Sequence, residues 1–207
     1  MKIEFLSLEL LKRSNALTLF VGLGNPDLQY KNNRHNVGFM VIDSFIDDQT
    51  SCERITKSSF QGELFKCASH LFLKPTTYMN LSGQSVRSVS DYYKPSEIIV
   101  IHDDLDLPFG TLRFKIGGGH GGHNGLRSID AHIGVEYIRI RIGIGKPAHK
   151  SDVSSYVLSN FSQCQREFLP KIIMHVKESM KALLRKDLKE VSVQYSLKES
   201  LCEEEKL

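Results

Sequence analysis

The sequence predicts a single α/β domain, and three observations support that prediction. Short apolar runs of strand length alternate along the chain with segments that have the apolar spacing of helices, as in α/β folds. No Pro/Ser-rich linker and no internal repeat divides the chain. Its 207 residues are 41% hydrophobic and 25% charged, which is ordinary for a soluble globular domain. We expect the domain to span residues 16–190, between an N-terminal extension of residues 1–15 and a charged C-terminal tail of residues 191–207.

Each expected element follows from a local pattern. A compact apolar run predicts a buried strand at residues 16–22, which the following Gly-Asn-Pro turn ends. The spacing of apolar residues over 37–49 indicates a helix. The later expected elements are a hairpin at 62–74 with its turn near 68–70, a polar loop at 75–83, a helix after that loop, a buried strand at 98–102, an acidic turn at 103–108, a short helix beginning near residue 126, and a long amphipathic helix at 168–184 that Pro170 interrupts or opens.

Two further strands each combine an apolar face with basic residues. Apolar side chains alternate with polar or charged ones over 111–116 and 137–145, and successive side chains of a strand point to opposite faces. The strands therefore carry two basic residues each on one face or rim, namely Arg113, Lys115, Arg139 and Arg141. Such residues are compatible with plain solubility, but two such strands in one sheet could form a basic patch.

Residues 117–125 form a glycine-rich segment in which six of nine residues are glycine. Glycine adopts positive φ freely and lets a ligand approach the backbone, at an entropic cost. A flexible linker is one interpretation, although such linkers are mostly Gly and Ser. A loop that contacts a ligand is the interpretation we favour, because a helical pattern follows the segment directly.

Composition limits the class of protein. A net charge of +3 permits a polyanionic partner without requiring one. The four cysteines form no C-x-x-C pair, which argues against a structural zinc site and a disulfide framework, so we expect reduced thiols. No secretion signal and no apolar run of about 20 residues is evident. A cytoplasmic protein without a membrane anchor is the resulting expectation.

Polar loops follow the predicted strands, where ligands bind in open α/β sheets. The glycine segment lacks the Lys and hydroxyl residue of a P-loop, and its formal G-x-G-x-x-G comes too late for a dinucleotide fingerprint. A metal site is the other alternative, and its candidate ligands are His102, Asp103, Asp104, Asp106, His120 and His123. The chemistry we favour is metal-free and cofactor-free general-base catalysis by His35, with Asp103 as its orienting carboxylate.

Six motifs occur in order along the chain. They are Val21-Gly-Leu-Gly-Asn-Pro26, Arg34-His-Asn-Val-Gly-Phe39, Lys74-Pro-Thr-Thr-Tyr-Met-Asn-Leu-Ser-Gly83, His102-Asp-Asp-Leu-Asp-Leu-Pro108, Phe114-Lys-Ile-Gly-Gly-Gly-His-Gly-Gly-His-Asn-Gly125 and Arg141-Ile-Gly-Ile-Gly-Lys-Pro147. Together they closely resemble the bacterial-type peptidyl-tRNA hydrolases, over about residues 17–185.

The resemblance implies a monomeric α/β enzyme with a central twisted mixed sheet that hydrolyses the ester between a peptide and the terminal ribose of tRNA. By motif position, His35 would activate water, Asp103 would orient it, and Asn25 would act at the scissile ester. The implied substrate-binding residues are Tyr30, Tyr78, Met79, Asn80, Gly121, His123 and Asn124. The implied tRNA-binding residues are Arg113, Lys115, Arg139 and Arg141, in agreement with the strand alternation.

The chain departs from the family pattern at a few positions. Asp27 stands where glycine is usual, Asn33 replaces the more usual threonine, and residues 1–15 extend beyond the usual start. None of these differences removes an expected catalytic residue. A non-catalytic RNA-binding relative and a metal-dependent hydrolase remain the alternatives to the enzyme.

Overall fold

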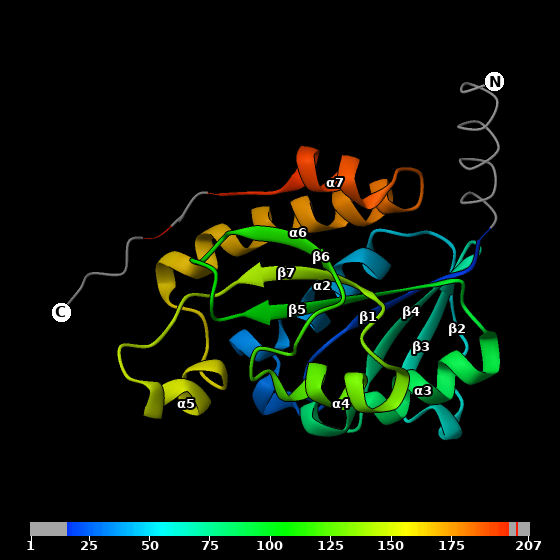
Figure 1. Cartoon of the computed structure of the whole chain (residues 1–207), viewed down its shortest axis with the longest axis horizontal. Helices are drawn as coiled ribbons and strands as arrows, with labels where there is room; N and C mark the ends of the chain where they lie inside the picture. Colours follow the sequence, from blue (N-terminus) through cyan, green and yellow to red (C-terminus); the bar gives the residue numbers. More distant parts are fainter. Residues whose placement is uncertain (1–15, 199–201, 203–207) are drawn as a thin grey trace.

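The computed structural model describes residues 16–198 and residue 202 of the chain. Its centre is a seven-stranded mixed sheet with the order β2-β3-β4-β1-β5-β7-β6 (Figure 1). The strands are β1 (Thr18–Gly22), β2 (Cys52–Arg54), β3 (Gly62–Cys67), β4 (His70–Pro75), β5 (Glu97–Asp104), β6 (Leu112–Ile116) and β7 (Ile138–Gly143). The expected single α/β domain is confirmed, while the N-terminal extension predicted at 1–15 lies outside the described residues.

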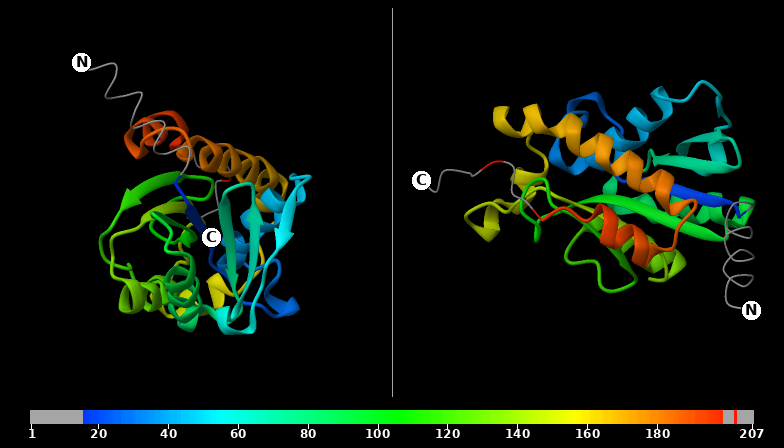
Figure 2. Two further views of the ribbon diagram at one scale, coloured as in Figure 1. Left: turned by 90° about the vertical axis from the view of Figure 1, so that its right-hand side faces the viewer. Right: turned by 90° about the horizontal axis from the view of Figure 1, so that it is seen from above.

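Helices cover both faces of the sheet, as the views in Figures 1 and 2 show. They are α2 (Val37–Asp47), α3 (Ser82–Tyr93), α4 (Asn124–Ile133), α5 (Val153–Val157), α6 (Gln163–Leu183) and α7 (Leu188–Tyr195). Successive side chains of β5 point to opposite faces of the sheet, and each face packs in its own core cluster. Ile99 and Ile101 pack in the cluster that includes α2, α6 and α7, whereas Val100 packs in the cluster that includes α3 and α4.

The parallel strands bring the functional loops to one edge of the sheet. Strands β4, β1, β5 and β7 are parallel neighbours, so their carboxyl ends meet at that edge. The loops that follow β1 and β4, and the last residues of β5, therefore lie close together. Such an edge is where ligands bind in open α/β sheets.

The predicted elements agree with the structure in kind and approximate position. The helix at 37–49, the hairpin turning at 68–70 and the strand at 98–102 correspond to α2, β3–β4 and β5. Helix α6 begins earlier than the apolar pattern indicated, because Ser162 and Gln165 form a reciprocal capping box. Pro170 accordingly lies within the helix and does not begin it.

The basic strands differ from the prediction in one respect that matters for function. Arg139 is 2% exposed, so its placement on an accessible basic surface is wrong. Residue alternation identified the face of β7 correctly, but α4 and the glycine segment cover that part of the face. At the outer strand β6, Ile116 is 55% exposed, so the apolar face of this edge strand is only partly covered.

The predicted C-terminal tail is partly folded. Helix α7 crosses the expected boundary after residue 190, and Val191 is fully buried. Beyond α7, Leu197 forms an antiparallel bridge with Leu112 of β6. The residues from 191 to 197 therefore belong to the packed domain.

The cysteines also differ from the prediction. Cys52 and Cys67 are directly opposite each other in the antiparallel β2–β3 pair and form a disulfide. Cys164, in the first turn of α6, forms a second disulfide with Cys202. The expectation of four reduced thiols is therefore wrong for this structure. The spacing of cysteines along a sequence does not show which of them the fold brings within bonding distance.

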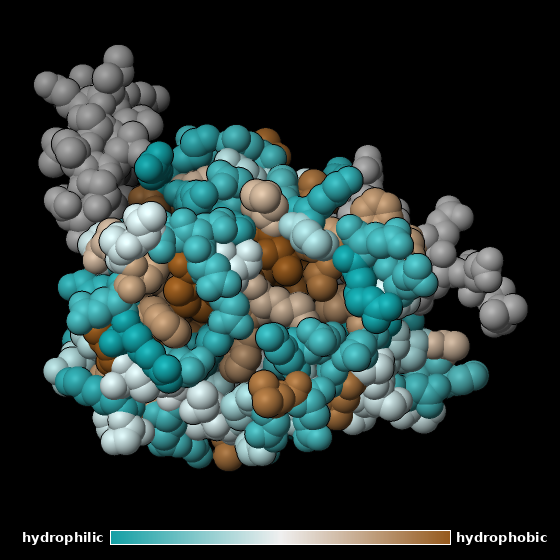
Figure 3. Space-filling model, turned by 180° about the vertical axis from the view of Figure 1, so that it is seen from behind, coloured by the Kyte–Doolittle hydropathy of each residue, from teal (hydrophilic) through white to brown (hydrophobic). Residues whose placement is uncertain are grey.

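The hydrophobic cavity of the molecule does not coincide with the predicted catalytic residues. Hydrophobic residues gather in a hollow on the face seen from behind (Figure 3). A cavity of ≈ 320 Å³ among the described residues is lined by Asn32, Met40, Asn160, Phe161, Arg166, Leu169, Pro170 and Ile173. None of the predicted catalytic residues lines this cavity, so the site is located by its polar groups instead. None of the described helices has the length and apolar character that a membrane crossing requires.

Gly83→Ala tests the close packing of α3 on α4. A Cβ at residue 83 would lie 2.1 Å from the carbonyl oxygen of Ser128, so we expect a loss of roughly 1–3 kcal/mol in the free energy of unfolding, measured by urea denaturation. Gly119→Ala is the matched control, since no heavy atom lies within 4 Å of its Cβ position. Equal effects of the two substitutions would contradict the packing account.

Candidate active site

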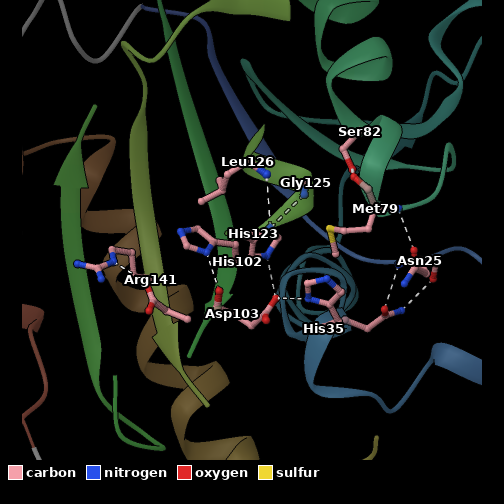
Figure 4. Close-up of polar contacts among 12 residues, drawn as sticks. Asn25, His35, Met79, Ser82, His102, Asp103, His123, Gly125, Leu126 and Arg141 are labelled. Atoms are coloured by element: carbon pink, nitrogen blue, oxygen red, sulfur yellow. Dashed lines mark hydrogen bonds and ion pairs between the residues drawn. The ribbon is translucent and has the colours of Figure 1, made fainter. Parts of the chain in front are cut away.

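Two histidines donate to the same buried carboxylate oxygen. His35 Nδ1 lies 2.8 Å from Asp103 Oδ1, and His123 Nε2 lies 3.0 Å from the same atom (Figure 4). The side chain of Asp103 is 2% exposed, and those of the two histidines are each 9% exposed. The three residues come from the end of β5, the turn before α2 and the start of α4. A single carboxylate therefore connects three elements.

The hydrogen-bond partners identify the tautomer of His123. Its Nδ1 accepts from the backbone N–H of Gly125 at 3.1 Å and of Leu126 at 3.4 Å, capping α4. An accepting Nδ1 leaves the proton of the neutral ring on Nε2, which donates to Asp103. His35 has the opposite arrangement, because its Nδ1 faces Asp103 and its Nε2 has no hydrogen-bond partner among the described residues.

Burial and charge shift the pKa values of this group. Burial lowers the pKa of His35, but the charge of Asp103 and its hydrogen bond outweigh that effect, so the pKa lies above the usual 6.5. Burial raises the pKa of Asp103, but the two histidines hold it well below its usual range. Asp103 is therefore a carboxylate at neutral pH, able to orient His35 and to stabilise its protonated form.

His102 is a neutral structural neighbour of this group. Burial, and then the proximity of His123, lower its pKa to about 3. Its Nδ1 donates to the backbone carbonyl of Asp103 at 2.7 Å, and its Nε2 is buried without a partner among the described residues. His102 thus fixes the end of β5 and carries no charge at neutral pH.

The residues on either side of His35 fix its position. Asn36 Oδ1 accepts from the backbone N–H of Asn25 at 3.0 Å, and Asn36 Nδ2 donates to the Asn25 carbonyl at 2.9 Å. The buried Arg34 donates to the carbonyl of Asn160 and to Gln165 Oε1, which ties the turn to the start of α6. Sequence reasoning missed both roles, because each partner lies in another segment of the chain.

Asn25 presents its amide N–H groups to the site. Its Oδ1 accepts from the backbone N–H of Met79 at 2.9 Å, and Met79 is buried beside it. That bond assigns the opposite end of the amide, Nδ2, as a donor group that has no partner in the described part of the chain. This hydrogen bond joins the loop that follows β1 to the loop that follows β4.

The other predicted substrate-binding residues surround this centre to different degrees. Asn80 and Asn124 are exposed next to the fixed residues Met79 and His123, and Gly121 is exposed at φ 57°. Tyr30 is half-buried at the end of the 3-10 helix Leu28–Tyr30. Tyr78, 47% exposed, donates to Asp27 Oδ2 at 2.7 Å, so the unusual Asp27 helps to join the two loops.

The remaining basic residues lie on β6 and β7. Lys115 is exposed, and Arg141 donates through Nε to Asp104 Oδ2 at 2.7 Å while keeping 26% of its side chain exposed. Arg113 is directly opposite Arg141 in the sheet register, and it donates to the carbonyl oxygens of Leu112 and Leu197. Three of the four predicted basic residues are therefore at least partly accessible.

Among the described residues, the group that could hold a metal ion consists of His35, Asp103 and His123, whose candidate ligand atoms lie within 4.8 Å of one another. A histidine binds a metal through an unprotonated nitrogen. In His123 that nitrogen is Nδ1, which caps α4 and points away from Asp103. The protonation pattern therefore favours a hydrogen-bonded group over a metal centre at this position.

Comparisons with known proteins point to one family. Residues 19–203 match the sequence model of the family described as peptidyl-tRNA hydrolase. A peptidyl-tRNA hydrolase from a Sulfurovum species is 59% identical over 184 residues, covering 88% of this chain and 97% of that protein. One from Sulfurimonas denitrificans is 57% identical over 180 residues, covering 87% of this chain and 97% of that protein.

A solved structure gives the same result for the fold. The peptidyl-tRNA hydrolase from Acinetobacter baumannii matches with a TM-score of 0.82 and 37% sequence identity, over 90% of this chain and 97% of that one. Sequence and fold together show that the chain belongs to the peptidyl-tRNA hydrolase family.

Proposed function

We propose that this enzyme hydrolyses the peptidyl-tRNA ester without a metal or cofactor, with His35 as the general base. The observation that carries the proposal is the pair formed by His35 Nδ1 and Asp103 Oδ1 at 2.8 Å. Because Asp103 holds the ring proton on Nδ1, the lone pair of Nε2 is available to a water molecule. The site of reaction then lies between His35 and the Asn25 amide, which Figure 4 shows on the side of His35 away from Asp103.

The reaction requires one proton to move twice. Water loses a proton to His35 Nε2 as its oxygen bonds to the ester carbonyl carbon. The bond between that carbon and the ribose oxygen then breaks, and the ribose oxygen takes the proton from His35. Asp103 stays ionised throughout and stabilises the transient imidazolium.

Amides supply the other part of the proposed mechanism. The free Nδ2 group of Asn25 can donate to the oxygen on which negative charge develops, and its rigid attachment to Met79 and Asn36 reduces the cost of reorganisation. The exposed amides of Asn80 and Asn124 can bind the peptide backbone. Backbone hydrogen bonds tolerate variation in the peptide side chains, as a general recycling enzyme requires.

The accessible basic residues fit the tRNA part of the substrate. Lys115, Arg113 and Arg141 lie on the two adjacent strands β6 and β7. Contacts of such residues with phosphates supply affinity without reading sequence. We assign tRNA binding to these three residues and remove Arg139 from the group, because it is buried.

His35→Ala tests the base. Removal of a positioned general base costs about 10²- to 10⁴-fold in rate, so kcat for release of an N-blocked amino acid from tRNA should fall by that amount. Binding of tRNA alone should be unchanged, and chelator should not affect the wild type. Full activity of the variant would exclude His35 as the base.

The pH dependence tests the role of Asp103. A base must be unprotonated, so kcat/KM should rise with pH along an acid limb with an apparent pKa above 6.5. Asp103→Asn removes the charge that raises this pKa and leaves the burial that lowers it. The acid limb of this variant should move to lower pH, and its plateau should fall. An acid limb that stays in place or moves upward would contradict the assignment.

Arg141→Ala tests the tRNA surface. KM for full-length peptidyl-tRNA should rise, and the slope of log KM against log salt should decrease by about 1 if one phosphate contact is lost. A minimal substrate that carries only the terminal nucleotide should be little affected. Equal losses with both substrates would show that Arg141 does not contact the body of the tRNA.

A further inference from the structure

Arg139 and Arg141 lie on the same face of β7, yet their surroundings are opposite. Arg139 is 2% exposed, and its guanidinium donates through Nη1 to the Gly119 carbonyl at 2.9 Å and through Nη2 to the Gly118 carbonyl at 2.6 Å. Arg141 instead remains partly exposed against Asp104. The charged group of Arg139 is therefore buried and donates hydrogen bonds to the backbone of the glycine segment.

The fork of the guanidinium suits this contact. Two nitrogens of one rigid plane bind two successive carbonyl groups, which fixes the direction of the backbone as well as its position. Gly117 and Gly118, at φ 64° and 84°, give the segment the conformation that presents these carbonyls. A lysine at residue 139 would keep the charge but could not reproduce the paired geometry.

The fixed segment leads directly to the catalytic carboxylate. After Gly119, the chain turns back through a hydrogen bond from the backbone N–H of His123 to the carbonyl of His120 at 2.9 Å. His123 then caps α4 and donates to Asp103 at 3.0 Å. Only three residues thus separate Gly119, the nearer contact of Arg139, from His123, the second histidine on the carboxylate.

The same guanidinium also contacts the second half of α4. Arg139 Nη2 lies 3.3 Å from Asp130 Oδ1, which also accepts from the hydroxyl of Tyr137 at 2.6 Å. Burial, then the hydrogen bond to Asp130, raises the pKa of Tyr137, which keeps the hydroxyl as a donor. Helix α4 is held at its first turn by His123 and at Asp130 by Arg139, so both contacts bear on the position of one helix.

We propose that Arg139 is a positioning residue that acts through His123: it fixes the glycine segment and α4 so that His123 holds Asp103 in place for His35. The inference rests on the proposed function, since its effect appears in the rate of ester hydrolysis. It also replaces the expectation that Arg139 binds tRNA directly. The difference between the two roles is measurable, because positioning affects kcat while a phosphate contact affects KM and its dependence on salt.

A double-mutant cycle on kcat tests the proposal. Displacement of a catalytic group by about 1 Å can cost on the order of 10²-fold, so Arg139→Lys should lower kcat by about 10- to 100-fold. KM for full-length peptidyl-tRNA and its salt dependence should remain as in wild type. If Arg139 acts through His123, kcat of Arg139→Lys/His123→Ala should equal that of His123→Ala alone. Arg141→Ala combined with His123→Ala is the matched control and should show independent effects.

Three results would overturn the proposal. One is a rise in KM with a flattened salt dependence in Arg139→Lys, which would show a direct tRNA contact. The second is a double variant whose losses multiply, which would show that Arg139 does not act through His123. The third is unchanged backbone hydrogen exchange over residues 117–123 in Arg139→Lys, where faster exchange is expected.

A second variant and a second readout complete the test. Should Arg139→Lys fail to fold, Asp130→Asn, which removes the carboxylate that Arg139 contacts, provides the same cycle with the same expectations. Tyr137→Phe is its control, because it removes one hydrogen bond to Asp130 and leaves the contact of Arg139 with that carboxylate. Absence of hydrolysis in the wild type would refute the proposed function itself, whereas the hydrogen-exchange result would still report on the contact.

Discussion

The site depends on one buried oxygen, Asp103 Oδ1, which accepts hydrogen bonds from His35 and His123. Each histidine donates one N–H to this atom, so its other ring nitrogen points away from the carboxylate. In His123 that nitrogen caps α4, whereas in His35 it has no partner among the described residues. The two rings share a carboxylate but differ in chemical capacity, because only His35 retains a nitrogen that can accept a proton from water.

The surrounding structure holds this arrangement from several directions. Asn36 fastens Asn25 beside the histidine, Arg34 ties the same turn to α6, and His102 fixes the end of β5. These contacts are largely buried, where hydrogen bonds are worth more than in water and unpaired groups are costly. These contacts thus form an orienting framework around His35, the residue that we propose as the general base.

Sequence patterns predicted the elements well, because strand alternation, helix spacing and turn residues are local properties. The pairing of His35 with Asp103 was also within reach, because the chemistry of a base requires an orienting carboxylate. The contacts of Arg139 could not be predicted from the sequence, because strand alternation shows which face a side chain occupies but not what covers that face. The pairing of Cys52 with Cys67 depends on strand register, which their spacing does not reveal.

The tautomers of the two histidines test the shared carboxylate most directly. Long-range ¹H–¹⁵N correlation spectra of the free enzyme, recorded at a pH where both rings are neutral, report which nitrogen of each ring carries the proton. The account predicts a proton on Nδ1 in His35 and on Nε2 in His123, and so two opposite tautomers directed at one oxygen. The same tautomer in both rings would contradict it, because one of the histidines could not then donate to Asp103.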